Sequence, residues 1–157
     1  MKKKTAILLH DIRSTHNVGS IFRTADTMGV SKIYISGYTP IPLDKYGRWR
    51  KDIAKVALGA EKIVVWERVK SPVNLIKKLK REKYHVISFE QSKNSIDYKK
   101  VKVRYPVLFI VGNEVSGVDS KILALSDIVA EIKMMGKKES LNVSVAFGII
   151  ISRIINI

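Results

Sequence analysis

The most informative stretch of the chain reads Pro106-Val107-Leu108-Phe109-Ile110-Val111 and continues as Gly112-Asn113-Glu114-Val115-Ser116-Gly117-Val118. Its first half is a continuous apolar run, which is typical of a strand buried on both faces of a sheet. Its second half is bounded by glycines, which let a ligand approach the backbone closely. The stretch therefore predicts a central strand that ends in a ligand-binding loop, with a plain tight turn as the alternative.

The rest of the chain alternates between short apolar runs and helical patterns. Further strands are expected at residues 6–9, 33–35, 64–66, 86–89 and 128–132. Helices are expected from Val18 to a stop at Gly29, around 75–79 and 122–125, and from about Leu141 to the end. This alternation indicates an α/β fold, with a largely parallel sheet covered by helices on both faces. No repeat or linker interrupts residues 1–157, so we expect a single domain.

The charge of the chain is unusual, because 29 Lys and Arg residues face only 14 Asp and Glu residues and leave a net charge of +15. Such a surplus favours polyanionic partners, of which nucleic acid is the commonest. A membrane surface is less favoured, because no long helix pairs a basic face with Trp and Phe. The remaining alternative is a charge that serves solubility alone.

Cysteine is absent, which excludes disulfides and thiolate metal sites. The three histidines, His10, His16 and His85, lie in different segments, so no metal is expected. The apolar runs at residues 6–9 and 145–151 are too short for a signal peptide or a membrane span. We therefore expect a cytoplasmic protein with no membrane partner.

The last helix is apolar on nearly every face from Val143 to Ile155. A helix of this kind must be buried all round, and one sheet covers only part of its surface. The excess predicts a homodimer with a two-fold interface, and a core helix in a monomer is the alternative.

Polar residues stand near the expected starts of the first and last helices and in the loop after the central strand. Asn17 stands where the first strand turns into the first helix and is a candidate N-cap. Arg23 lies opposite the apolar stripe of that helix. Its guanidinium is either simply solvated or binds a phosphate or ribose through its forked N–H groups. Ser140 is a candidate N-cap of the last helix. In the loop after the central strand, Val118 and Asp119 follow Gly117, whereas a Walker loop has Lys and then Ser or Thr there, so triphosphate binding is disfavoured. The negative charge of Glu114 in this loop suits a cationic ligand.

Three segments taken together resemble the three motifs of the SpoU (TrmH-like) branch of the SPOUT RNA methyltransferases. They are N-V-G-S-I-F-R-T-A-D-T-M-G-V from Asn17, V-G-N-E-V-S-G-V from Val111 and M-G-K-K-E-S-L-N-V-S-V-A from Met135. Their order and spacing also match, over about residues 6 to 155. The resemblance implies a homodimer, an α/β fold with a deep trefoil knot near the C-terminus, and S-adenosylmethionine as methyl donor.

The resemblance also assigns roles to individual residues. It implies a donor pocket formed by Phe89, Gly112, Asn113, Ile132, Ser140 and Leu141. It places Asn17, Arg23, Glu114, Ser140 and Asn142 on the functional polar positions of the family. Family proposals give Arg23 the role of activating the ribose hydroxyl. Because a guanidinium stays protonated, we favour Arg23 as a stabiliser of the developing alkoxide and a clamp on the adjoining phosphate. A general base is the alternative. Asn17 and Glu114 would position Arg23, while Ser140 and Asn142 shape the transfer pocket.

The motifs span nearly the whole chain, so we expect the catalytic domain itself to grip the RNA. The resemblance favours tRNA over rRNA, because small proteins of the SpoU type most often act on tRNA. Together with Arg23, the candidates for RNA contact are Lys45, Arg48, Trp49, Arg50 and Lys51. A solvated basic loop is the alternative.

Three other functions remain to be weighed. An RNA base methyltransferase of the same superfamily is less favoured, because the Asn17–Arg23 motif and the Ser140-Leu141-Asn142 segment indicate ribose. An inactive RNA-binding module is less favoured because the functional polar residues are present. A nucleotide-dependent oxidoreductase would need a G-x-G-x-x-G fingerprint that the chain lacks.

Overall fold

The computed structural model describes residues 3–156, which form one seven-stranded parallel sheet with the strand order β3-β2-β1-β6-β4-β7-β5. The strands are β1 (Thr5–His10), β2 (Lys32–Ser36), β3 (Trp66–Arg68), β4 (His85–Phe89), β5 (Ile96–Asp97), β6 (Val107–Val111) and β7 (Ile128–Glu131). The helices are α1 (Thr15–Thr27), α2 (Lys51–Ala57), α3 (Ala60–Ile63), α4 (Pro72–Arg81), α5 (Ser120–Leu125) and α6 (Val143–Ile155), with a 3₁₀ turn at Tyr98–Lys100. The predicted α/β class is confirmed.

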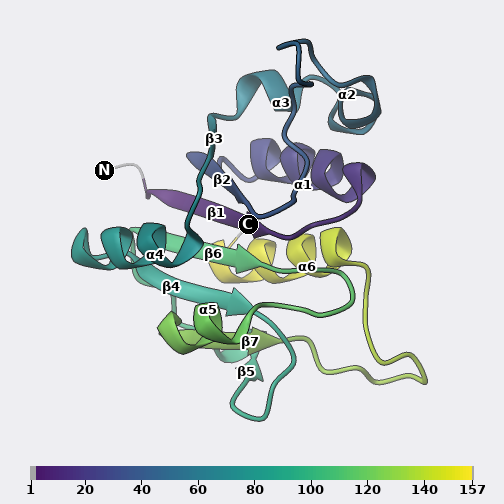
Figure 1. Ribbon diagram of the computed structural model, residues 1–157. Coiled ribbons are helices and arrows are strands. Elements are labelled where there is room, and N and C mark those ends of the chain that lie inside the picture. Colours follow the sequence, from purple (N-terminus) through teal and green to yellow (C-terminus); the bar gives the residue numbers. More distant parts are fainter. Residues whose placement is uncertain (1–2, 157) are drawn as a thin grey trace.

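Helices cover both faces of the sheet (Figure 1). Side chains alternate along a strand, so Ile7 and Leu9 of β1 pack toward one face, and Ala6 and Leu8 pack toward the other. The first face is covered by α1, α2 and α6, and the second by α4 and α5. Because both faces are covered, the central strands β1, β4 and β6 are buried almost throughout, and β6 is entirely apolar.

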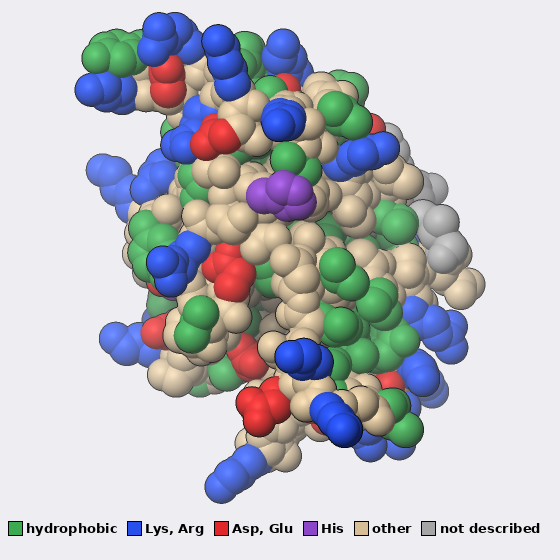
Figure 2. Space-filling model, turned by 90° about the vertical axis from the view of Figure 1, so that its right-hand side faces the viewer, with side chains coloured by type: hydrophobic (Ala, Val, Ile, Leu, Met, Phe, Trp, Pro, Cys, Tyr) green, Lys and Arg blue, Asp and Glu red, His purple; other side chains and the backbone are tan. Residues whose placement is uncertain are grey.

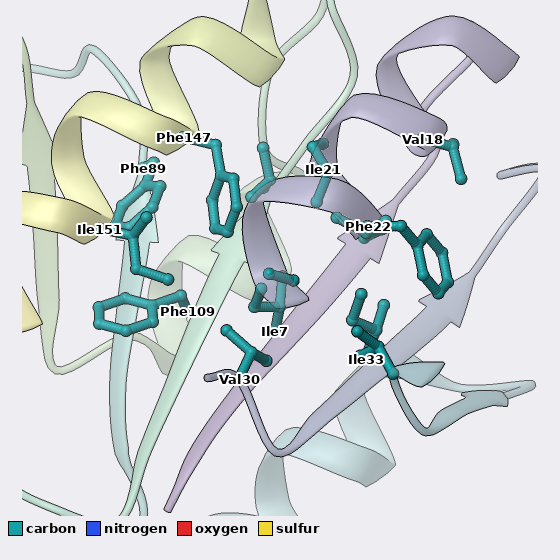
Figure 3. Close-up of a cluster of buried hydrophobic side chains, with 14 of the residues drawn as sticks. Ile7, Val18, Ile21, Phe22, Val30, Ile33, Phe89, Phe109, Phe147 and Ile151 are labelled. Atoms are coloured by element: carbon teal, nitrogen blue, oxygen red, sulfur yellow. The ribbon is translucent and has the colours of Figure 1, made fainter. Parts of the chain in front are cut away.

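The core on the α1 and α6 side is built around three aromatic rings. Phe89 of β4 lies 5.3 Å from Phe109 of β6 and 6.3 Å from Phe147 of α6, measured between ring centroids. Figure 3 shows Phe147 and Ile151 pointing from α6 toward these two rings. This packing fixes α6 beside the carboxyl ends of β4 and β6, where the candidate site lies.

Two helix starts differ from the predicted ones. Ser14, not Asn17, caps α1: its side chain accepts from the Asn17 backbone N–H, and Asn17 lies buried in the first turn. Asn142, not Ser140, caps α6, because its Oδ1 accepts from the N–H groups of Ser144 and Val145. Asn and Ser suit an N-cap equally well, so the sequence pattern could not decide between neighbouring polar residues.

The third strand is also displaced from its predicted position. It begins at Trp66 rather than at Val64, because Val64 closes the short helix α3. That helix and α2 were not expected, and neither was the two-residue strand β5. Within residues 3–156, every helix is too short or too polar to cross a bilayer.

Helix α6 is only partly buried in one chain. Its side chains Phe147, Ile150, Ile151 and Ile154 are buried, whereas Val145 is 49% and Ile149 38% exposed. One chain therefore covers only part of this helix, as expected, and the alternative of a helix buried on all sides within a monomer is wrong. Its outer face retains the apolar surface from which a homodimer is predicted.

Candidate active site

The three sequence motifs meet at the side chain of Asn17. Its Nδ2 donates to Glu114 Oε1 over 3.0 Å, and its Oδ1 accepts from Asn142 Nδ2, also over 3.0 Å. Asn17 is only 5% exposed, so both hydrogen bonds are largely shielded from water. One residue from α1 thus joins the loop after β6 to the start of α6.

Glu114 is a hub of this junction. Its carboxylate also accepts from the backbone N–H groups of Arg13, at 2.9 Å from Oε2, and Ser14, at 3.0 Å from Oε1. Partial burial raises the pKa of the Glu114 carboxyl, but the hydrogen bonds from Arg13, Asn17 and Ser14 outweigh it and lower the pKa below its usual value. The side chain is therefore ionised at neutral pH and ties the β6 loop to the segment before α1.

The loop after β6 closes on itself between Asn113 and Gly117. Their backbones exchange two hydrogen bonds of 3.1 and 3.0 Å. A Cβ on Gly112 would lie 2.5 Å from the Gly117 carbonyl oxygen, so only glycine fits there. The buried Asn113 side chain fixes the loop to its surroundings, since its Nδ2 donates to the Asp11 carbonyl and to the Tyr38 hydroxyl.

A pocket of about 360 Å³ opens beside this loop, at the carboxyl ends of β4, β6 and β7. Ligands of open parallel sheets commonly bind at this end of the strands. All six residues predicted to hold the donor line the pocket, namely Phe89, Gly112, Asn113, Ile132, Ser140 and Leu141. Glu114 lines it as well, whereas Asn17 and Asn142 stand behind it in the hydrogen-bonded junction.

The pocket is acidic although the chain as a whole is strongly basic. Four carboxylates line it, those of Glu90, Glu114, Glu131 and Glu139, and the lining residues among 3–156 include no Lys, Arg or His. Figure 2, which faces this end of the strands, shows acidic side chains toward the middle and basic ones around much of the outline. Such a pocket suits a cationic or neutral ligand and disfavours a phosphate.

Glu90 is a site residue that sequence reasoning missed. It directly follows β4, where its backbone N–H donates to the Ala130 carbonyl oxygen of β7. The available signal was its position, since a polar residue directly after a buried strand stands at the ligand-binding end of the sheet. Residues 3–156 contain no group of three or more acidic or histidine side chains placed to hold a metal ion.

Arg23 lies away from the pocket in a single chain. It is exposed on α1, six residues after Asn17, or about 9 Å further along the helix axis. Within the described part of the chain, its guanidinium makes no hydrogen bond or ion pair, and neither Asn17 nor Glu114 contacts it.

Apart from Arg23, the residues predicted to contact RNA, which include four cations, lie in the turn before α2 and in its first residue. Leu43 and Trp49 form a β-bridge that holds the turn. Arg48 is paired with Asp44 at 2.9 Å and Arg50 with Asp52 at 2.7 Å, while Lys45, Trp49 and Lys51 are exposed. Two of the four predicted cations are thus partly neutralised.

Comparison with known proteins agrees with the resemblance in the three motifs. The sequence model of the SpoU rRNA Methylase family matches residues 4–152. The tRNA (guanosine(18)-2′-O)-methyltransferase of Aquifex aeolicus is 31% identical over 150 residues, which are 96% of this chain and 68% of that protein.

Solved structures share the fold. The crystal structure of the A. aeolicus TrmH/SpoU tRNA-modifying enzyme aligns with a TM-score of 0.84 at 30% identity, over 97% of this chain and 74% of that chain. The AdoMet-bound rRNA methyltransferase of Sinorhizobium meliloti gives 0.86 at 24% identity, over 98% and 56%. The chain spans between 54% and 68% of the length of the curated relatives it matches.

Proposed function

Because the chain belongs to the SpoU family of methylases, we propose that it transfers a methyl group from S-adenosylmethionine to a ribose 2′-hydroxyl of RNA. The observation that supports this most is the junction at Asn17, which joins all three motifs beside one pocket. A tRNA substrate is favoured over rRNA, since the relative with 31% identity is named for position 18 of tRNA.

The pocket fits the donor in shape and charge. Phe89, Leu141 and Ile150 supply apolar wall for an adenine ring, and the glycine at 112 lets a ligand reach the backbone. The carboxylates around the pocket offset a positive charge. When bound, S-adenosylmethionine supplies a methyl group already activated on a positively charged sulfonium.

The acceptor hydroxyl must be held in line with that methyl group and helped to lose its proton. We assign this task to Arg23, as a fixed positive charge that stabilises the developing alkoxide and clamps the neighbouring phosphate. Ser140 lines the pocket and Asn142 caps α6 behind it, so we assign both to shaping the place where the hydroxyl would enter. Asn17 and Glu114 hold the loops around it.

A second copy of the chain would complete the site. Arg23 does not line the pocket of its own chain, while α6, which packs against α1, exposes Val145 and Ile149. We propose a two-fold dimer through α1 and α6 that brings Arg23 of one subunit to the pocket of the other. The basic turn at residues 45–51 would then grip the RNA backbone.

We further propose that the C-terminal part of the chain forms a trefoil knot. The order of the elements supports this proposal, because β4 lies between β6 and β7 in the sheet. After β6 the chain therefore passes over β4 to form β7. It must then come back, since α6 packs against α1 and the 98–100 turn. Pulling the two ends of the protein apart should leave a shorter final extension than an unknotted chain of equal length would reach.

The function is tested by incubating the protein with methyl-labelled donor and total RNA from cells that lack the gene. Ribose methylation blocks alkaline cleavage at the modified nucleotide, so the label should remain in an alkali-resistant dinucleotide. A label recovered in a mononucleotide after alkaline cleavage would instead indicate a base methyltransferase. Donor binding without transfer to any RNA would indicate an inactive binding module.

A further inference from the structure

Glu90 is held rigidly at the wall of the pocket. One carboxylate oxygen, Oε2, accepts from the Val118 backbone N–H at 2.6 Å, and the other, Oε1, accepts from the Gln91 N–H at 2.8 Å. These bonds fix the side chain although no cation pairs with it among residues 3–156. A charged group that is fixed in advance can bind a ligand without losing further side-chain entropy.

The loop after β6 is shaped to admit this carboxylate. Gly117 has a φ of +73°, and a Cβ at this position would lie 1.9 Å from Glu90 Oε2. Any other residue would therefore displace the Glu90 side chain. Together with Glu114, which anchors the near end of the loop to Arg13 and Ser14, Glu90 anchors its far end at Val118.

Glu90 lines the pocket together with the residues assigned to the donor. β4 pairs with β6 so that Phe89 lies opposite Val111, and with β7 so that Phe89 lies opposite Ala130. One residue further along, Glu90 stands between Gly112 and Glu131 at the pocket rim. Glu90 therefore directly follows the strand that lies between β6 and β7, and the loops after β6 and β7 form the pocket.

Each carboxylate oxygen has two lone pairs, and each has used one on the backbone. Two acceptor sites on one rigid group remain for a ligand. A pair of adjacent hydroxyls is the matching donor, and carboxylates elsewhere bind ribose hydroxyls of dinucleotides in this way. Phosphate and carboxylate ligands would be repelled.

We infer that Glu90 is a specificity-determining residue that accepts hydrogen bonds from the 2′- and 3′-hydroxyls of the donor's own ribose. This inference rests on the proposed function. It distinguishes the ribose of the donor, bound at Glu90, from the ribose of the RNA, which is methylated beyond the Asn17 junction.

Calorimetry without any RNA tests the inference. The probes are S-adenosylhomocysteine and its 2′-deoxy and 3′-deoxy analogues, each titrated into the wild-type protein and into Glu90→Gln. Because hydrogen bonds to a charged group are strong, each deoxy analogue should bind about 10- to 100-fold more weakly to the wild type. In Glu90→Gln the loss should shrink to about 3-fold or less, because the charge is gone while an amide oxygen can still hold the Val118 N–H.

The matched control is Glu82→Gln, which removes an exposed carboxylate that does not line the pocket and should leave all three affinities and their ratios unchanged. If the wild type binds all three probes equally, the inference is wrong while the proposed function stands. The same holds if Glu90→Gln keeps the full discrimination. If the wild type binds none of the probes, the proposed function itself fails.

Discussion

Asn17 Nδ2 lies 3.0 Å from Glu114 Oε1, although 97 positions separate the two residues in the chain. The bond is partly buried, and its acceptor also holds the backbone that leads into α1. Its partner bond to Asn142 spans 125 positions. The geometry of the pocket therefore depends on a single amide that satisfies one acceptor and one donor at once.

Asn17→Ala should destabilise the protein and weaken donor binding together. It leaves a buried Glu114 oxygen and the Asn142 amide short of a partner, which costs about 1–3 kcal/mol in the free energy of unfolding. Asn17→Asp should cost more at pH 7, because it sets a second carboxylate beside Glu114 and removes the donor. Urea denaturation and calorimetry with S-adenosylhomocysteine measure both effects. A fully stable Asn17→Ala protein with normal affinity would show that the junction is incidental.

The pH dependence of stability should report on Glu114. Its pKa is lower in the folded protein than the unperturbed value of 4.5, so its contribution to stability is fully present above that value. The contribution is lost as the pH falls through the lower, folded pKa. Thermal melts of the wild type and Glu114→Gln should therefore differ most at neutral pH and converge in acid. A difference that stays constant down to about pH 3 would exclude a role for the charge.

Gly112→Ala should be costly because its Cβ would overlap backbone rather than a flexible side chain. The nearest atoms belong to Gly117 and Val118, at 2.5–2.6 Å. Opening the turn should lower the free energy of unfolding by about 1–3 kcal/mol and abolish donor binding. Gly136→Ala is the control, since nothing lies within 4 Å of its Cβ, and it should change stability by less than about 0.5 kcal/mol. Equal melting temperatures for the two variants would contradict the prediction.

The sequence predicted the central architecture because the central strands are buried on both faces. Continuous apolar runs such as 107–111 have few alternatives in a chain of this size. The short elements could not be predicted in this way. β5 has two residues and exists only because β7 pairs with it, and α3 has four residues that also suit a loop.

In the candidate site, too, the sequence pattern predicted some features, whereas others depend on tertiary contacts. The motifs indicated that Asn17, Glu114 and Asn142 are functional, but their mutual contacts depend on tertiary structure across about 100 residues. The pattern also suggested that Asn17 caps α1, whereas the cap is Ser14, which frees the Asn17 side chain for the junction. Glu90 belongs to none of the three motifs, and only the structure reveals the two backbone N–H groups that hold it beside the pocket.

The basic turn before α2 should affect RNA affinity and not donor affinity. Lys45→Ala combined with Lys51→Ala removes two exposed cations that form no ion pair within residues 3–156. The slope of log K for RNA against log salt concentration should become shallower by roughly 0.7–0.9 for each phosphate that the variant no longer neutralises. Filter binding at several salt concentrations measures the slope. The exposed pair Lys77→Ala and Lys78→Ala on α4, on the other face of the sheet, is the control with equal charge change. Identical slopes for the two double variants would place the RNA elsewhere.

Arg23→Ala should leave donor binding nearly intact and reduce methyl transfer by at least about 100-fold, because it removes the charge that we propose stabilises the alkoxide. Arg81→Ala, on the exposed surface of α4, should have no effect on transfer.

If Arg23 serves the pocket of the other subunit, mixing the Arg23→Ala protein with the Glu114→Ala protein should restore activity. Each mixed dimer then contains one site with an intact pocket and an intact Arg23. Because about half of the dimers in an equal mixture are mixed, about a quarter of the wild-type activity per subunit should return. If Arg23 acts within its own chain, no mixed dimer has a complete site. The mixture would then stay as inactive as its components, and an Ile149→Asp variant, which disrupts the exposed face of α6, would retain its activity as a monomer.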